Sequence, residues 1–116
     1  MNNFKELTVW IRSIEMVGKI YSTTACFPKE EIYGIVNQIR RAAVSVPSNI
    51  AEGAGRNTGK EFAHFLAIAL GSCFELETQL IIAKNLGFLP EEELNRLEDS
   101  LGEIQKMLRG LQKSLS

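Results

Sequence analysis

Apolar residues recur at intervals of three and four along most of this chain, a spacing that places them on one side of an α-helix. Four helical segments are predicted, from about Lys5 to Cys26, from Pro28 to Gly53 or Gly55, from Gly59 to about Leu86 and from Pro90 to Leu115. The positions expected to face a core are Leu7, Trp10, Ile11, Ile14, Val17 or Gly18 and Tyr21 in the first segment, Ile32, Val36, Ile39, Ala43, Val46 and Ile50 in the second, Phe62, Leu66, Ala69, Cys73, Leu76, Leu80 and Ala83 in the third, and Leu94, Leu97, Leu101, Ile104, Leu108, Leu111 and Leu115 in the fourth.

Proline, glycine and a capping box mark the segment boundaries. Pro28 and Pro90 each precede acidic residues, which favours a helix start. The run 58–61 is a capping box, and Gly87 supplies a left-handed stop. Pro47 lies inside the second segment and predicts a kink there, with two shorter helices as the alternative.

The connections between the segments are short, so neighbouring helices are expected to run antiparallel. With 116 residues the chain is long enough for one core and is expected to form a single domain over residues 1–116. The predicted fold is all-α, an antiparallel up-down-up-down four-helix bundle.

The third segment is apolar on nearly all sides, because Phe65, Ile68, Phe74 and Ile81 lie outside its core positions. A lone bundle cannot cover both sides of such a helix, so a partner surface is expected, and a second copy of the chain is the simplest partner. In the resulting homo-oligomer we expect the first two helices at the rim of the interface and the third in its core.

A polar track crosses the second segment and continues in the third. Its candidate residues are Arg40, Arg41, Ser45, Asn49, Glu52, Arg56 and Glu75. In an antiparallel hairpin turning near Asn57, Arg40 or Arg41 is level with Glu75, Ser45 with Gly71, and Glu52 with His64.

Small residues at 63, 67 and 71 are expected to let the two helices of this hairpin approach closely. The polar residues then either satisfy one another in a partly buried network that fixes the hairpin register, or line a ligand or RNA site. We favour the network, because every group in it can find a partner.

Net charge and composition argue against strong binding to nucleic acid and against contact with a membrane. The formal net charge is −1, without the basic excess usual in nucleic-acid-binding proteins of this size. Residues 1–5 lack the layout of a signal peptide, and the nearly uncharged run 62–74 is too short to cross a bilayer, so a cytoplasmic location without membrane contact is expected. Cys26 and Cys73 are interpreted as core residues.

Catalytic and cofactor motifs are not assembled. His64 is the only histidine and Asp99 the only aspartate, which excludes a Ser-His-Asp triad and a histidine-rich metal site within one chain. The glycines of residues 53–59 resemble a phosphate-binding loop, but the required strand is not expected and an acid, Glu61, stands where a hydroxyl is needed. No catalytic residue, metal or cofactor is therefore predicted, and His64 is expected to be a half-buried helix residue.

The stretch from Gln38 to Gly53, with Tyr33-Gly34 before it and Arg56, Glu61-Phe62, 65–72 and 75–80 after it, resembles the four-helix bundle proteins encoded in intervening sequences of bacterial 23S ribosomal RNA genes. The resemblance implies a homopentameric ring with no established enzymatic activity. It also extends to the accessory variability determinant of diversity-generating retroelements, which binds a reverse transcriptase and RNA through a basic ring surface.

Two functions follow as hypotheses. The leading one is a non-enzymatic homo-oligomeric scaffold or interaction protein, and the alternative is a nucleic-acid-binding accessory module of a ribonucleoprotein or reverse-transcriptase system, whose partner is RNA or protein. A third and weaker hypothesis is an enzyme acting at Glu52, His64 and Arg56.

Overall fold

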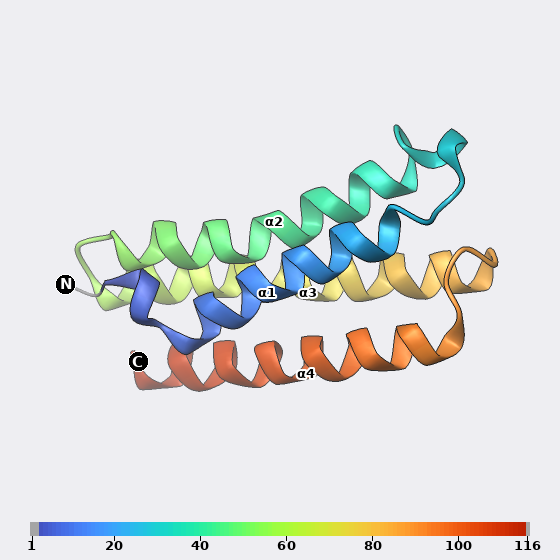
Figure 1. The fold of residues 1–116 in the computed structure, drawn as a ribbon. Helices are drawn as coiled ribbons and strands as arrows, with labels where there is room; N and C mark the ends of the chain where they lie inside the picture. The colour runs from blue at the N-terminus through green and yellow to red at the C-terminus, as the bar shows by residue number, and fades with distance from the viewer. Residues whose placement is uncertain (1–2, 116) are drawn as a thin grey trace.

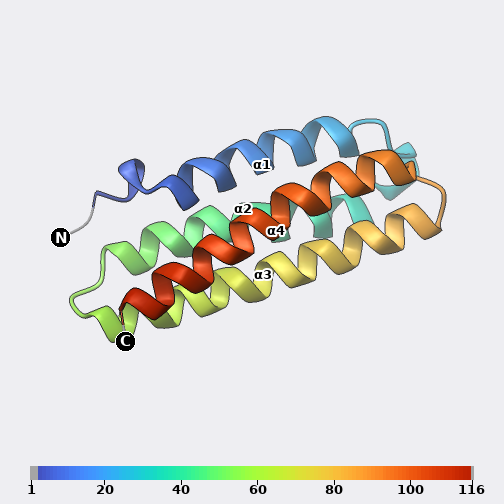
Figure 2. The same cartoon turned by 90° about the horizontal axis from the view of Figure 1, so that it is seen from below.

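The computed structural model describes residues 3–115, and Met1, Asn2 and Ser116 lie outside the described part. Its helices are α1 (Thr8–Thr24), α2 (Ile35–Ala54), α3 (Gly59–Asn85) and α4 (Glu91–Ser114). They run alternately up and down along one long axis, with the start of α1 and the end of α4 on the side of the α2–α3 turn (Figures 1 and 2). The predicted antiparallel four-helix bundle is confirmed. The expectation about a signal peptide rests partly on Met1 and Asn2, outside the described residues.

The capping box and the glycine stop predicted at the two ends of α3 are both present, with one change in the capping box. The Thr58 hydroxyl accepts a hydrogen bond from the Glu61 amide at 3.1 Å, but it also donates to the Glu61 carboxylate, so the acid does not reach back to the Thr58 backbone. At the other end Gly87 has a φ of 84°, and the Phe88 amide donates to the Ala83 carbonyl at 2.9 Å. This pair of features stops the helix in the left-handed manner expected of glycine.

The first two predicted helices are shorter than expected. A turn of 3-10 helix (Phe4–Glu6) precedes α1 and is separated from it by the extended residue Leu7. A second such turn (Lys29–Glu31) follows Pro28, and α2 begins only after Gly34, whose backbone is not helical. Pro47 lies inside a continuous α2 rather than between two helices, and Figure 1 shows α2 bending along its length.

The core confirms the expected faces of α3 and α4, and that of α2 except at Ile32, which precedes α2 and is 43% exposed. The expected face of the first helix is only partly right: Leu7, Trp10 and Val17 pack against the core, but the remaining positions do not. The expected positions Ile11, Ile14, Gly18 and Tyr21 point outward. The buried positions of α1 are Val9, Ser13, Met16, Ile20 and Thr24. Two of these are polar, and each is satisfied within the helix: Ser13 donates to the Trp10 carbonyl at 2.8 Å and Thr24 to the Ile20 carbonyl at 2.7 Å.

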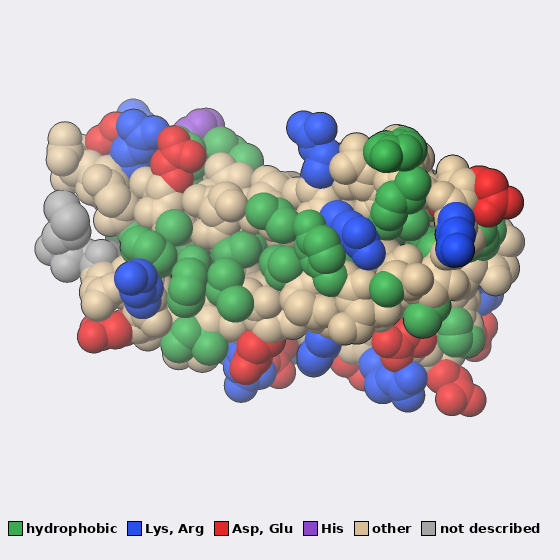
Figure 3. Space-filling model, turned by 45° about the horizontal axis from the view of Figure 1, so that its top comes forward, with side chains coloured by type: hydrophobic (Ala, Val, Ile, Leu, Met, Phe, Trp, Pro, Cys, Tyr) green, Lys and Arg blue, Asp and Glu red, His purple; other side chains and the backbone are tan. Residues whose placement is uncertain are grey.

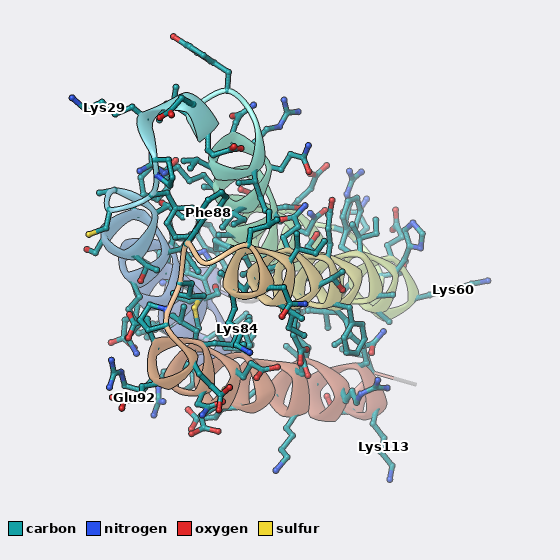
Figure 4. The ribbon with its side chains drawn as sticks, turned by 90° about the vertical axis from the view of Figure 1, so that its right-hand side faces the viewer. Lys29, Lys60, Lys84, Phe88, Glu92 and Lys113 are labelled. Carbon is teal, nitrogen blue, oxygen red and sulfur yellow. The ribbon has the colours of Figure 1, made fainter. Side chains whose placement is uncertain are left out.

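Aromatic side chains close the end of the bundle where the α1–α2 and α3–α4 turns meet. Phe27 is buried and its ring centroid lies 5.7 Å from that of Phe88. Figure 4 shows Phe88 pointing into the molecule at this end, whereas Lys29 projects away from it.

By length and composition alone, α3 could cross a membrane, and it is the one helix within residues 3–115 that meets this test. The run 62–74, which is too short to cross a bilayer, is only a part of this helix, so the expectation of no membrane contact did not take the whole helix into account. The core helix of a bundle passes the same test, and α3 fully buries Leu66, Leu76 and Leu80 against its neighbours. We therefore assign its apolar character to packing.

Candidate interaction surface

The middle of the α2–α3 hairpin is held by small polar side chains. The hydroxyls of Ser45 and Ser72 lie 2.8 Å apart, and the Asn49 amide donates to both the Ser45 carbonyl and the Ser45 hydroxyl. Ser45 was expected level with Gly71, so the predicted register is right to within one residue. This group joins α2 to α3 without any charged side chain.

The close approach of the two helices occurs at a different place from the one predicted. A Cβ added at Gly71 would meet nothing within 4 Å, and Ala67 is exposed, so the expected ridge of small residues faces outward. The backbones meet instead at Gly53, where a Cβ would lie 2.7 Å from Phe65 Cβ. Gly53 was missed because its place at the end of the helix suggested a stop signal rather than a packing position.

The other polar candidates do not join this group. Arg56 pairs with Glu52 at 2.8 Å on the exposed side of α2, and its guanidinium lies 4.6 Å from the centroid of the Phe65 ring. His64 is exposed, not half-buried as predicted, with its ring against the edge of Phe65. Glu52, His64 and Arg56 thus lie near one another in solvent.

Arg40 and Arg41 are neighbours in sequence but differ in their surroundings. The Arg40 Nε donates to the Thr24 hydroxyl at 2.9 Å, and its guanidinium lies 4.5 Å from the centroid of the Tyr21 ring. Arg41 is exposed, and within residues 3–115 no side-chain hydrogen bond or ion pair involves it.

Arg41 and Glu75 line a common hollow between α2 and α3 but form no ion pair, and Glu75 instead accepts from Gln79 at 3.5 Å. In the described part of the chain the predicted network is therefore divided into separate groups around Ser45, Glu52 and Arg40. Gln79 Oε1 is buried and lacks a hydrogen-bond partner among these residues.

Two outward faces of the bundle carry large apolar side chains. On α3 these are Ile68, Phe74, Ile81 and Ile82, each between 39% and 45% exposed. On α1 and the adjoining part of α2 they are Ile11, Ile14, Tyr21 and Val44, exposed to a similar degree. Figure 3 shows hydrophobic side chains running along the α1–α2 face, with Lys and Arg side chains among them.

The buried thiol of Cys73 is not an activated nucleophile. Burial, reinforced by the charge of Glu77, raises the pKa of the Cys73 thiol to about 12, so this thiol stays protonated at neutral pH. Cys26 is exposed, contrary to the expectation that both cysteines are core residues. Among residues 3–115 no three His, Cys, Asp or Glu side chains are placed to hold a metal ion.

The pKa values of two carboxylates on α4 are shifted in opposite directions. Hydrogen bonds from Arg96 and Thr23 lower the pKa of Glu93. Partial burial raises the pKa of Glu98, and a hydrogen bond with Glu77 and the charges of Glu77 and Asp99 add to this. These shifts concern helix contacts, because Thr23 belongs to α1 and Glu77 to α3.

The structure places this protein in the class of small antiparallel helical bundles. Its outer surface carries apolar side chains on α3 and on α1 and α2. The family model for the 23S rRNA-intervening sequence protein matches residues 5–110, and the chain belongs to that family.

A solved structure has the same fold. It is described as a protein with unknown function from the S23 ribosomal protein family of Bacteroides thetaiotaomicron, and it matches with a TM-score of 0.82 at 24% sequence identity, over 91% of this chain and 99% of that chain. No curated protein matches.

Proposed function

We propose that this protein is a non-enzymatic scaffold or interaction protein that assembles from identical copies into a ring, with five copies as the resemblance of its sequence implies. The observation that supports this proposal is the outward face of α3, where Ile68, Phe74, Ile81 and Ile82 remain partly exposed although the opposite face of the helix is fully buried. Apolar surface concentrated on one side of a helix is characteristic of contact with another protein surface.

The free energy gained by burying the outward face of α3 is small, which favours assembly through more than one face. Completing the burial of a large side chain that is already about three-fifths buried contributes roughly 1 kcal/mol. Four such residues give about 4 kcal/mol, which is comparable to the lower estimates of the entropic cost of association. A ring in which each copy also uses Ile11 and Ile14 of α1 gains the additional area.

Light scattering after size-exclusion chromatography tests this proposal. The expected mass is near five times the 12.9 kDa of the chain, and a monomer at micromolar concentration would overturn the proposal. Ile81→Glu places a charge on the outward face of α3 and should dissociate the assembly, whereas Asn95→Glu, at an exposed position of α4, should leave the mass unchanged. Circular dichroism of both variants verifies that the bundle remains folded.

The alternative function is an accessory module that binds RNA, and the observation favouring it is the exposure of Arg41 in α2 and of Arg56 in the turn that follows α2. The same chromatography with a short structured RNA tests it. Phosphate-driven binding must weaken steeply between about 50 mM and 500 mM salt, because released counterions oppose it. A mass that does not respond to RNA at low salt would exclude this function.

A further inference from the structure

Two adjoining hollows lie at the corner where α1 turns into α2. The larger, of about 590 Å³, has walls formed by Tyr21, Ile32, Tyr33 and Val44. The smaller, of about 310 Å³, is lined by Phe27, Pro28 and Val36 among others, and it shares Ile32 and Arg40 with the first. Tyr33 is 92% exposed, so the corner carries an aromatic ring that the fold of one chain leaves uncovered.

The charge of this corner differs from that of the chain. Lys29, Arg40 and Arg41 line the two hollows, and no Asp or Glu does so, although the chain as a whole has a formal charge of −1. The hollow between α1 and α4, by contrast, is lined by Glu15, Asp99 and Glu103 as well as by basic residues. The lining of these two hollows is therefore apolar and positive, although Glu30 and Glu31 lie in the same turn as Lys29.

The two arginines differ in how they could bind an anionic group. Arg40 is fixed by Thr24 and by the Tyr21 ring, so its position is already set before a ligand arrives. Arg41 has no side-chain partner within residues 3–115, so its guanidinium can bind a carboxylate without first losing another contact.

We propose that these hollows bind an acidic peptide segment of another protein, with aliphatic or aromatic side chains in the hollows and carboxylates on Arg40 and Arg41. The proposal goes beyond the scaffold function: it uses Tyr21 and Val44 at the α2 end of the second apolar face, and neither the outward face of α3 nor Ile11 and Ile14, which the assembly uses. The walls favour a peptide over RNA, because Ile32, Val44 and Val36 match aliphatic side chains, whereas RNA would place phosphates against apolar walls with only three cations to neutralise them.

A selection from random peptides displayed on phage tests the proposal with the protein as it exists. The enriched peptides should combine Asp or Glu with Leu, Ile or Phe, and one of them, labelled with fluorescein, then serves as the probe in fluorescence polarisation. Arg41→Glu should weaken its binding at least tenfold, and Val44→Asp should do the same through the apolar wall. Lys106→Glu makes the same change of charge at an exposed position of α4 and should leave the affinity unchanged.

The possible results separate this proposal from the proposed function. Ile81→Glu should bind the peptide normally even where it dissociates the assembly, and Arg41→Glu should keep the assembly intact while losing the peptide. Failure to enrich acidic peptides, undiminished peptide binding by Arg41→Glu and Val44→Asp, or displacement of the peptide by single-stranded RNA that binds more tightly would each overturn the proposal. Loss of the assembly in Arg41→Glu would also overturn it, because the corner would then be occupied by a second copy.

Discussion

Along the α2–α3 boundary the backbones approach at Gly53 and small hydroxyl groups meet at Ser45 and Ser72, whereas along the α1–α4 boundary long charged side chains make the polar contacts. The contacts between α1 and α4 include the ion pair of Arg12 with Glu103 and hydrogen bonds from Lys19 to Ser100 and from Thr23 to Glu93. A hollow of about 150 Å³ lies between these charged groups. One boundary thus depends on steric fit and the other on charge, so they should respond to different perturbations.

The largest effect is expected at Gly53. In Gly53→Ala the new Cβ would lie 2.7 Å from Phe65 Cβ and 2.9 Å from Phe62 Cδ1, so the helices must separate. We expect the free energy of unfolding in urea to fall by about 1–3 kcal/mol, although alanine is otherwise the better helix former.

The matched control for this substitution is Gly102→Ala in α4, where a Cβ meets nothing within 4 Å. This change should raise the free energy of unfolding by up to about 1 kcal/mol. Equal effects of the two substitutions would contradict the steric account of the α2–α3 boundary.

A smaller effect is expected from the serine pair. Ser72→Ala removes a 2.8 Å hydrogen bond at a buried position, and Ser45 keeps the bond from the Asn49 amide. The free energy of unfolding should fall by about 1 kcal/mol. Ser100→Ala, which loses only a 3.4 Å contact with Lys19 across the α1–α4 boundary, should cost less than about 0.5 kcal/mol in the same urea titration.

The ion pair at the α1–α4 boundary should contribute still less. Arg12 and Glu103 are 48% and 50% exposed, so water screens their attraction. A double-mutant cycle with Arg12→Gln and Glu103→Gln should give a coupling of about 0.2–1 kcal/mol that decreases at high salt. A coupling that does not change between low and high salt would show that this boundary does not depend on charge.

The smallest effect is expected from pH acting on Glu93. Its pKa is lowered in the folded state, so its hydrogen bonds with Arg96 and Thr23 stabilise the fold above the ordinary pKa of 4.5, and this contribution is lost as the pH falls through the lowered value. Glu93→Gln should therefore reduce stability by less than about 0.5 kcal/mol at neutral pH and by less still in acid, because Glu93 is partly exposed and its partner Arg96 is mostly exposed, so water screens their interaction.

The pKa of Glu98, at the α3–α4 boundary, is shifted in the opposite direction to that of Glu93, so its effect on stability has the opposite sign. Its raised pKa means that its ionised form is disfavoured in the fold, so its penalty appears as the pH rises through the raised value. Glu98→Gln should raise the melting temperature slightly at neutral pH and not in acid. The same direction of change for Glu93→Gln and Glu98→Gln would contradict these assignments.

The sequence predicts three of the four core faces because α2, α3 and α4 each have one uninterrupted apolar series on the buried side. It fails for α1, which has two such series. The stronger one contains Ile11 and Ile14 and faces outward, whereas the buried one is interrupted by Ser13 and Thr24. Hydroxyl groups that bond to carbonyls of their own helix can be buried at little cost, and a pattern that counts only apolar residues does not detect them.

The candidate surface could be predicted only in part. Spacing alone places Ser45 level with Gly71, one residue from its observed partner Ser72, because antiparallel register follows from the position of the turn. The corner hollows depend on the delay of α2 until after Gly34, which separates Ile32 and Tyr33 from the helix and leaves them beside Tyr21. Pro28 followed by acids indicated a continuous helix there, so this corner was not predicted.

The different environments of the two thiols make the unmodified chain ready for site-specific labelling. A maleimide reacts with thiolates, so it should attach to exposed Cys26 and spare Cys73, whose thiol is buried and has a pKa of about 12. Cys26 directly precedes Phe27 and Pro28, which line the smaller corner hollow. A dye or spin label there reports on the α1–α2 corner without replacing any residue of the protein.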